Sequence, residues 1–387
     1  MTPDLRLYFD SQLDWMANLT RELVALESPT TDKAAVDRVG ERVAEELDHL
    51  GADLKIHPRT RVGDIIEARW HGGQPGERGS HGKPLLFVCH MDTVHPVGAV
   101  AANPIRVQDG RLYGPGSYDM KGSIAAMLGA LRGLRTLGLF PERPIVALLT
   151  SDEETGSEES RDLIQEIAAT SALALIMEPA LPDGSLKTWR KSTANFVVRA
   201  YGVAAHAGGA HETGLNAIEE MAHQILALQR MTDYTVGSTV SVGLISGGTA
   251  RNTVPDFCEA WVDARAMTVD EMERMTALIL GLTPVLPGAR VEVEGGFDRP
   301  PMERSPQMIQ TFNTAKEIGA RYGLTLREAG SGGASDGNYT AAVGTPTLDG
   351  LGPTGDGAHS EREHVIVQSL STSATLLAAL LLEWPEG

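Results

Sequence analysis

The chain has 387 residues, of which 42% are hydrophobic and 22% are charged, values typical of a soluble globular protein of two or more domains. Its formal net charge of −18 argues against nucleic acid and anionic membrane surfaces as binding partners. No window approaches the ~18 uninterrupted apolar residues of a membrane-spanning helix, and residues 1–30 are typical of an amphipathic helix rather than a signal peptide. Cys89 and Cys258 suggest neither a disulfide framework nor a metal-binding pair. We therefore expect a cytoplasmic protein.

The first half of the chain alternates amphipathic helices with apolar strands. The 3.6-residue periodicity predicts helices over 10–26, 33–50, 123–137 and 158–168. Strands are predicted over 53–57 and 64–69, and a Gly-rich surface loop over 71–84. Nearly continuous apolar runs over 85–89, 144–150 and 172–177 predict strands buried on both faces. This order indicates an α/β domain whose mostly parallel sheet is covered by helices.

The pattern changes near residue 188. Half-exposed strands alternate apolar and polar residues, and two amphipathic helices over 217–231 and 270–282 lie between them. A β-α-β-β-α-β order of this kind indicates the split-βαβ plan, so we predict an inserted domain over 188–300. The α/β pattern resumes after Pro300 with helices over 307–322 and 367–384. The first domain is therefore expected to comprise 1–187 and 301–387.

Charged side chains follow each of the three buried apolar runs. His90 and Asp92 follow the first run, Glu153 and Glu154 the second, and Glu178 the third. A loop before a helix supplies Asp119, and a late Gly-rich loop supplies His359. In open α/β sheets, sites lie outside the carboxyl ends of the strands. We therefore expect these side chains to meet at one edge of the sheet.

Two imidazoles with several carboxylates are ligands typical of zinc, cobalt or manganese. His90 and Asp92 are two residues apart in an extended segment, so the carboxylate is placed to orient the imidazole. Glu153 and Glu154 are adjacent and point in different directions, so that one can bind metal while the other faces a reacting water. The alternative is a solvated acidic rim without a cation, which leaves the two histidines unexplained.

The motifs HMDTV (90–94), GSYDMKG (116–122), DEETGS (152–157), MEP (177–179) and GDGAHSE (355–361) occur in this order. Together they resemble the M20 metallopeptidase family, which includes glutamate carboxypeptidase, succinyl-diaminopimelate desuccinylase, acetylornithine deacetylase and aminoacylase. The resemblance covers essentially the whole chain. It implies a zinc-exopeptidase-like catalytic domain, an inserted ferredoxin-like α+β dimerisation (lid) domain, and a homodimer.

The resemblance also implies two zinc ions per subunit, with cobalt or manganese as possible substitutes. Asp119 would bridge the two ions. The remaining ligands would be His90 and Glu178 at one ion and Glu154 and His359 at the other. Asp92 would orient His90, and Glu153 would be the general base. The family pattern further implies a cis peptide bond at Asp119–Met120.

Five further residues are candidates for substrate binding. By resemblance, His206 in AAHAG reaches the site of the partner subunit and helps to hold the oxyanion, and Asn252 contacts substrate. Arg299, with Arg265 as a weaker candidate, is expected to bind a substrate carboxylate. Gly333, in the loop SGGASDGN, is expected to offer a backbone N–H group to the substrate.

These observations predict a dinuclear zinc enzyme that hydrolyses an amide or peptide bond and releases an amino acid with a free α-carboxylate. The substrate would be a small acyl- or peptidyl-amino acid, and a glutamate-carboxypeptidase-like activity is the first choice. The alternatives within the enzyme class are an N-acyl-amino-acid deacylase and a dipeptidase. The alternative from another class is a non-catalytic metal-binding relative, for which loss of Glu153 or of a ligand would be the sign; none is lost.

Overall fold

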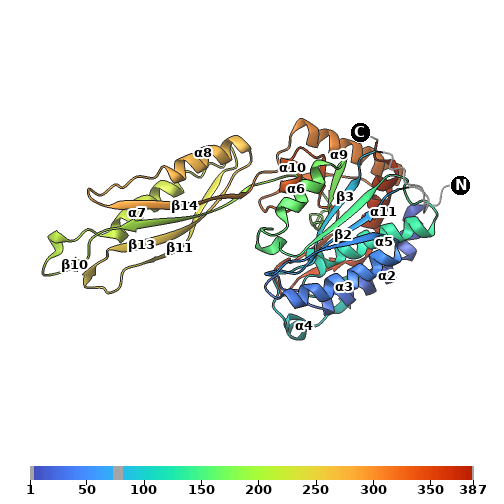
Figure 1. Ribbon diagram of the computed structural model, residues 1–387, viewed down its shortest axis with the longest axis horizontal. Coiled ribbons are helices and arrows are strands. Elements are labelled where there is room, and N and C mark those ends of the chain that lie inside the picture. Colours follow the sequence, from blue (N-terminus) through green and yellow to red (C-terminus); the bar gives the residue numbers. More distant parts are fainter. Residues whose placement is uncertain (1–3, 73–81, 386–387) are drawn as a thin grey trace. The chain divides into compact units, whose positions relative to one another are not determined.

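The computed structural model describes residues 4–72 and 82–385 (Figure 1). The predicted loop over 71–84 falls mostly on residues outside this range. The chain divides into two compact units. The inserted unit comprises Trp189–Glu303 with Ser331–Ala334, and the main unit comprises the rest of the described chain. Each unit is described by itself below.

The main unit is built on a mixed eight-stranded sheet in the order β1-β2-β6-β3-β7-β16-β8-β15. The pairs β6–β3, β3–β7 and β7–β16 are parallel, whereas β1–β2, β2–β6 and β16–β8 are antiparallel. The strands are β1 (Asp53–His57), β2 (Ile65–Trp70), β3 (Leu85–His90), β6 (Ile145–Thr150), β7 (Leu173–Ile176), β8 (Leu186–Arg190), β15 (Glu328–Ser331) and β16 (Thr347–Asp349). The predicted α/β class with a largely parallel central sheet is confirmed.

Helices cover both faces of this sheet (Figure 1). Alternate side chains of β3 separate two cores: Leu85 and Phe87 belong to the larger core, and Leu86 and Val88 to the smaller one. The larger core contains residues of α1 (Leu5–Ser11), α2 (Leu13–Ala25), α3 (Lys33–His49), α5 (Gly122–Thr136), α9 (Pro306–Arg321) and α11 (Val367–Glu383). The smaller core contains residues of α6 (Arg161–Ala169) and α10 (Gly337–Ala342). Burial on both faces explains why β3, β6 and β7 are nearly continuous apolar runs.

Short elements complete the main unit beside the end of the sheet. They are α4 (Ala99–Ala102), the helical turns η1 (Ser117–Lys121) and η2 (Glu153–Thr155), and the strands β4 (Arg106–Gln108), β5 (Arg111–Tyr113), β17 (Gly355–Asp356) and β18 (His364–Ile366). The four strands form a second sheet in the order β17-β18-β5-β4. This sheet joins the segment that contains His359 to the segment that precedes Asp119.

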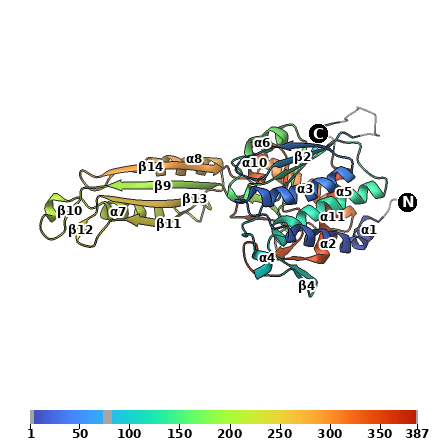
Figure 2. The ribbon, with the colours of Figure 1, turned by 60° about the horizontal axis from the view of Figure 1, so that its bottom comes forward.

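The inserted unit has a four-stranded antiparallel sheet in the order β11-β13-β9-β14 (Figure 2). Its elements are β9 (Thr193–Tyr201), α7 (Ala217–Gln229), β11 (Thr239–Gly247), β13 (Phe257–Arg265), α8 (Val269–Leu280) and β14 (Arg290–Arg299). Numbered within the unit, the strand order is 2-3-1-4, the ferredoxin-like arrangement. Both helices pack on one face, where buried side chains of β9 and β13 meet them. A small hairpin-like pair, β10 (Ala205–His206) with β12 (Thr253–Val254), and the turn η3 (His211–Thr213) lie outside this sheet.

Polar side chains set the starts of several helices. Asp32, Asn216, Thr268 and Ser305 each accept a backbone N–H bond from the first turn of α3, α7, α8 and α9, respectively. Such caps satisfy amide groups that have no partner within the helix. The helix predicted over 10–26 is confirmed as α2, which begins at Leu13 and ends at Ala25, whereas residues 5–11 form the separate helix α1. No helix in residues 4–72 and 82–385 combines the length and the apolar character that crossing a membrane requires.

Candidate metal centre

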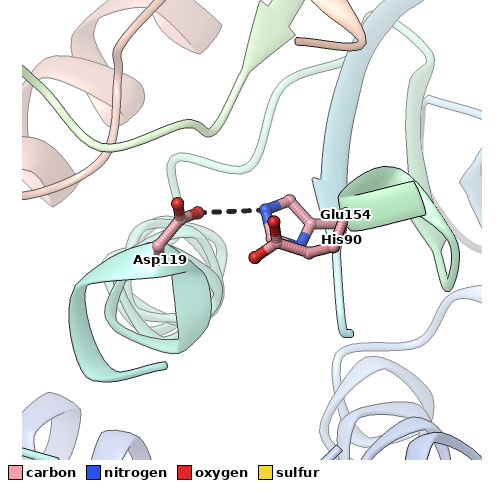
Figure 3. Close-up of side chains that lie close together, drawn as sticks. All are labelled: His90, Asp119 and Glu154. Atoms are coloured by element: carbon pink, nitrogen blue, oxygen red, sulfur yellow. Dashed lines mark hydrogen bonds and ion pairs between the residues drawn. The ribbon is translucent and has the colours of Figure 1, made fainter. Parts of the chain in front are cut away.

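His90 ends β3 and points its imidazole toward the cluster of carboxylates (Figure 3). Its Nδ1 lies 3.0 Å from the backbone oxygen of Asp92 and 3.6 Å from the carboxylate atom Oδ1 of the same residue. The hydrogen bond to the backbone oxygen places a proton on Nδ1 and leaves Nε2 facing the cluster. Asp92 therefore contacts the His90 imidazole through its backbone oxygen, at the shorter distance, and through its carboxylate.

The carboxylate of Asp92 also holds the next ligand segment. It is fully buried and accepts the backbone N–H groups of Glu153 at 3.3 Å and Glu154 at 3.2 Å. The Thr30 hydroxyl also donates to it at 2.6 Å. Glu153 and Glu154 lie in η2 directly after β6, so a charged side chain caps the turn that carries them. This contact fixes the two glutamates relative to His90.

Asp119 lies between the two histidines. Its Oδ1 is 3.1 Å from Nε2 of His90, and its Oδ2 is 3.4 Å from Nε2 of His359. Figure 3 shows Asp119 projecting toward His90 from the helical turn before α5. The Asp119–Met120 peptide bond is cis, as the family resemblance implied. The turn that precedes Asp119 requires glycine at position 116. The φ of Gly116 is 72°, and a Cβ added to this residue would lie 2.6 Å from the side chain of Thr93.

Glu178 and His359 complete the cluster. Glu178 follows β7, and its Oε1 lies 3.6 Å from Nε2 of His90. His359 lies in the loop after β17, and its Nε2 is 3.1 Å from Oε2 of Glu154. His359 has φ of 62°, a left-handed conformation that is uncommon for residues other than glycine. The five residues predicted as metal ligands are therefore brought together by five separate segments of the main unit.

The electrostatics of this cluster favour bound positive charge. Hydrogen bonds with Asp119 and Glu154 raise the pKa of His359 to about 10. Burial lowers the pKa of His90, but hydrogen bonds with Asp119 and Asp92 outweigh it, so that its pKa is raised well above the ordinary value. Burial raises the pKa of Glu154 to about 6, although the hydrogen bond with His359 opposes the shift. Protons on the imidazoles compensate the carboxylates here, and divalent cations would do the same.

The residues present fit a metal centre. Two sets of three side chains have ligand atoms within 4.8 Å of one another: His90, Asp119 and Glu154, and His90, Glu153 and Glu178. Among the described residues, Oε1 of Glu154 is buried without a hydrogen-bond partner, although buried carboxylate oxygens are nearly always satisfied. Imidazole and carboxylate donors in this combination suit zinc, cobalt or manganese.

Two substrate-binding candidates lie together in the inserted unit. His206 is exposed in β10, and Asn252 is exposed directly before β12. The backbone N–H of Ala207 donates to the backbone oxygen of Asn252 at 3.0 Å, which holds the two segments side by side. Nδ1 of His206 accepts the N–H groups of Gly208 at 3.1 Å and Gly209 at 2.9 Å. Because Nδ1 is an acceptor, the neutral imidazole carries its proton on Nε2.

The other three candidates of the inserted unit differ in their surroundings. Arg265 makes a two-pronged ion pair with Asp263, with its Nη2 2.7 Å from Oδ2. Arg299, at the end of β14, is only 5% exposed. The N–H of Gly333 donates to the Ser331 hydroxyl at 3.0 Å, so this group is already engaged within its own loop. Offering that N–H to a substrate would first require the Ser331 bond to break.

Two charged residues near the cluster were not anticipated from the sequence. Glu363 is fully buried and accepts backbone N–H groups of the segment that carries Asp119. Nζ of Lys187, in β8, lies 4.0 Å from Oε2 of Glu178. The only signal for Glu363 was its position four residues after His359. Asp152 is also buried, and it accepts the backbone N–H of Glu159 at 2.7 Å.

The strand ends of this α/β sheet bring together two imidazoles and several carboxylates, a set of groups that suits a metal-dependent hydrolase. Residues 86–383 match the family described as peptidase family M20/M25/M40, and the chain belongs to this family. The chain is 30% identical over 376 residues to carboxypeptidase G2 of Pseudomonas sp. (strain RS-16), which covers 95% of this chain and 88% of that protein. It is 28% identical over 392 residues to succinyl-diaminopimelate desuccinylase of Cereibacter sphaeroides, covering 95% and 98% of the two chains.

Solved structures show the same fold. Aminopeptidase PepT from Bacillus cereus superposes with a TM-score of 0.79 at 24% identity, over 96% of this chain and 98% of that one. The YXEP protein of Bacillus subtilis, described as a dinuclear metal-binding peptidase of the M20 family, gives a TM-score of 0.71 at 16% identity, over 96% and 98% of the chains. The predictions of the family, of the fold class and of a hydrolytic enzyme are confirmed.

Proposed function

We propose that this protein is a dinuclear zinc enzyme that hydrolyses an amide or peptide bond and releases an amino acid with a free α-carboxylate. Its preferred reaction would be that of a glutamate carboxypeptidase. The observation that carries the proposal is the contact of Asp119 with both His90 and His359, at 3.1 and 3.4 Å. One carboxylate facing two imidazoles is the arrangement expected of a bridging ligand. The similarity to carboxypeptidase G2 supports the choice of substrate class.

The side chains of the main unit would bind the metal ions and transfer protons. His90 and Glu178 would hold one zinc ion, Glu154 and His359 the other, and Asp119 both. Bound zinc supplies Lewis acidity, which polarises a carbonyl group and lowers the pKa of a water molecule. Glu153 would take the proton from the attacking water and pass it to the leaving nitrogen. A carboxylate oxygen of Glu153 lies within 4.8 Å of ligand atoms of His90 and Glu178, and this proximity supports its proposed role.

Groups of the inserted unit would bind the substrate. We propose that Nε2–H of His206 donates a hydrogen bond to the oxyanion, because its Nδ1 is already an acceptor of two N–H groups. Asn252 would contact the substrate, and Arg299 would bind the α-carboxylate with two hydrogen bonds. Arg265 and Gly333 have weaker support, since Asp263 and Ser331 already engage them.

We also propose a homodimer formed through the inserted unit, which would act as a dimerisation (lid) domain. β11 is an edge strand of its sheet, and Leu244 and Ile245 on it are 66% and 54% exposed. Leu226 of the adjacent helix α7 is 56% exposed. An apolar edge strand with unpaired backbone groups is a surface that a second copy can cover. Sedimentation velocity would test this, and a single species of 41.3 kDa would contradict it.

A cytoplasmic location is a further part of the proposal. Its support is that Cys89 and Cys258 are both buried as free thiols, as is common where thiols are kept reduced. Cell fractionation with the native protein would test it. Recovery of the protein in the periplasmic or extracellular fraction would contradict it.

The experiment for the proposed activity is amino-acid release by protein reconstituted separately with Zn²⁺, Co²⁺ and Mn²⁺. The panel would contain an aroyl-L-glutamate, N-acetyl amino acids, longer N-acyl amino acids and unblocked dipeptides, with chelator-treated protein as the control. An aroyl-glutamate whose α-carboxylate is amidated is the matched substrate. We expect metal-dependent release from the blocked glutamate and little from its α-amide. Preference for N-acetyl or unblocked substrates would instead indicate a deacylase or a dipeptidase.

A further inference from the structure

A buried carboxylate from a distant segment holds the backbone on which Asp119 lies. Oε1 of Glu363 accepts the N–H groups of Tyr118 at 3.0 Å and Asp119 at 2.9 Å. Its Oε2 accepts the N–H of Gly116 at 2.9 Å. Glu363 itself is 0% exposed. Three backbone N–H groups thus converge on one carboxylate group.

The same carboxylate contacts a third segment. Nε2 of His95 lies 2.7 Å from Oε2 of Glu363. His95 follows His90 by five residues, and Glu363 follows His359 by four. Glu363 therefore connects the segment of His90, the segment of Asp119 and the segment of His359.

We propose that Glu363 is a positioning residue, which fixes the direction of the Asp119 carboxylate between His90 and His359 and so sets how tightly the metal ions are held. The inference rests on the proposed metal centre. Its physical basis is that Glu363 accepts the backbone N–H of the same residue whose carboxylate lies between the two imidazoles. The backbone of Asp119 therefore cannot rotate without breaking this hydrogen bond. A small rotation of this backbone would change the distances from Asp119 to the two imidazoles, now 3.1 and 3.4 Å.

Residues beyond the ligands act on metal centres in this way. Groups that orient metal ligands typically change metal affinity or activity by about 10–100-fold when they are replaced. A carboxylate that served only to fold the loop would change the stability of the protein but leave the affinity of the folded protein for metal unchanged. The two roles can therefore be separated by measuring metal binding and unfolding on the same variant.

The experiment compares Glu363→Gln with Glu361→Gln, a matched control two residues away whose side chain is exposed. In Glu363→Gln the side-chain oxygen can still accept two N–H groups, but the new NH₂ group faces the N–H of Gly116 or the N–H groups of Tyr118 and Asp119. We expect affinity for Zn²⁺ and Co²⁺, measured by chelator competition, to fall about 10–100-fold. The visible absorption of the Co²⁺ form should change, and kcat should fall while KM changes by less than about threefold. Glu361→Gln should behave as the wild type.

Several outcomes would overturn the inference. Wild-type metal affinity and Co²⁺ absorption in folded Glu363→Gln protein would show that Glu363 does not position Asp119. If Glu363→Gln does not fold, His95→Asn provides the second test, because it removes one contact of Glu363 from the edge of the network. That variant should lose about tenfold in affinity, and unchanged affinity would equally refute the proposal. Absence of metal binding by the wild-type protein would instead refute the proposed function on which the inference depends.

Discussion

The central strands of the two units differ in how much of each strand is buried, and this difference separates their roles. In the main unit, β3 and β6 are buried at all six positions, because helices cover both faces. In the inserted unit, β9 and β13 alternate between buried positions and positions that are mostly only partly buried, because α7 and α8 cover only one face. A strand buried along its length can present polar groups only at its end, whereas a half-covered strand presents side chains along one whole face.

The candidate site residues follow the same division. In the main unit, His90, Asp119 and Glu154 lie at the ends of buried elements and contact one another or a shared imidazole. In the inserted unit, His206 and Arg265 bond to neighbours within their own loop or strand. The main unit thus contains all the residues that we propose for metal binding and proton transfer. The inserted unit contains the residues that we propose for substrate binding.

The largest effect should come from the general base of the main unit. Glu153→Gln keeps the shape of the side chain but removes its ability to accept a proton, so kcat should fall by about 10²–10⁴-fold. The metal content, measured by atomic emission, should remain that of the wild type. The matched control is Glu158→Gln, an exposed residue in the same segment whose carboxylate pairs with Arg61. Normal turnover by Glu153→Gln would refute the assignment of the base.

The main unit was more predictable from sequence than the inserted unit because its chemistry follows directly from its strands. Apolar runs predicted β3, β6 and β7 to within two residues at each end, and the residues after them formed the cluster. Glu363 could not be predicted, since an acid in the polar stretch HSEREH looks like any solvated surface acid. Its partners are backbone N–H groups about 245 positions away, and only the folded chain brings them together.

The sequence pattern also did not predict several local details of the structure. The two-residue spacing of His90 and Asp92 predicted a contact of the Asp92 carboxylate with the imidazole, but it did not predict the shorter contact, which is made by the backbone oxygen of Asp92. The helix is interrupted at Gln12, between α1 and α2, but the spacing of apolar residues continues across this position. The interruption therefore could not be predicted from the apolar periodicity. The sheet of β4, β5, β17 and β18 was missed because its strands have two or three residues, too few for alternation to be visible.

An intermediate effect is expected from the inserted unit. His206→Asn should lower kcat by about 10²–10³-fold if Nε2–H donates to the oxyanion. His211→Asn, an exposed histidine of the same loop region, is the control and should have no effect. Mixed dimers that carry His206→Asn in one subunit and Glu153→Gln in the other would show which subunit the imidazole serves. Loss of activity at both sites of the mixed dimer would contradict action across the subunit boundary, because a cross-acting His206 leaves one intact site, in which the subunit that carries His206→Asn keeps its own Glu153 and receives the intact His206 of the other subunit.

The smallest effect should come from Arg265, and it tests whether the inserted unit contributes a second carboxylate-binding group. Asp263 engages the guanidinium through both oxygens, and the two side chains are 29% and 42% exposed. A pair this exposed contributes about 1 kcal/mol or less, so Arg265→Lys should lower the free energy of unfolding by no more than that. If Asp263 is its only partner, KM for a blocked glutamate should change by less than about fivefold, the equivalent of that energy.

The comparison is with Arg299→Lys, measured by steady-state kinetics on the same substrate. Arg299 is only 5% exposed and is our candidate for binding the α-carboxylate. A larger rise in KM for Arg265→Lys than for Arg299→Lys would reverse the two assignments, because the bidentate geometry of arginine is lost in lysine.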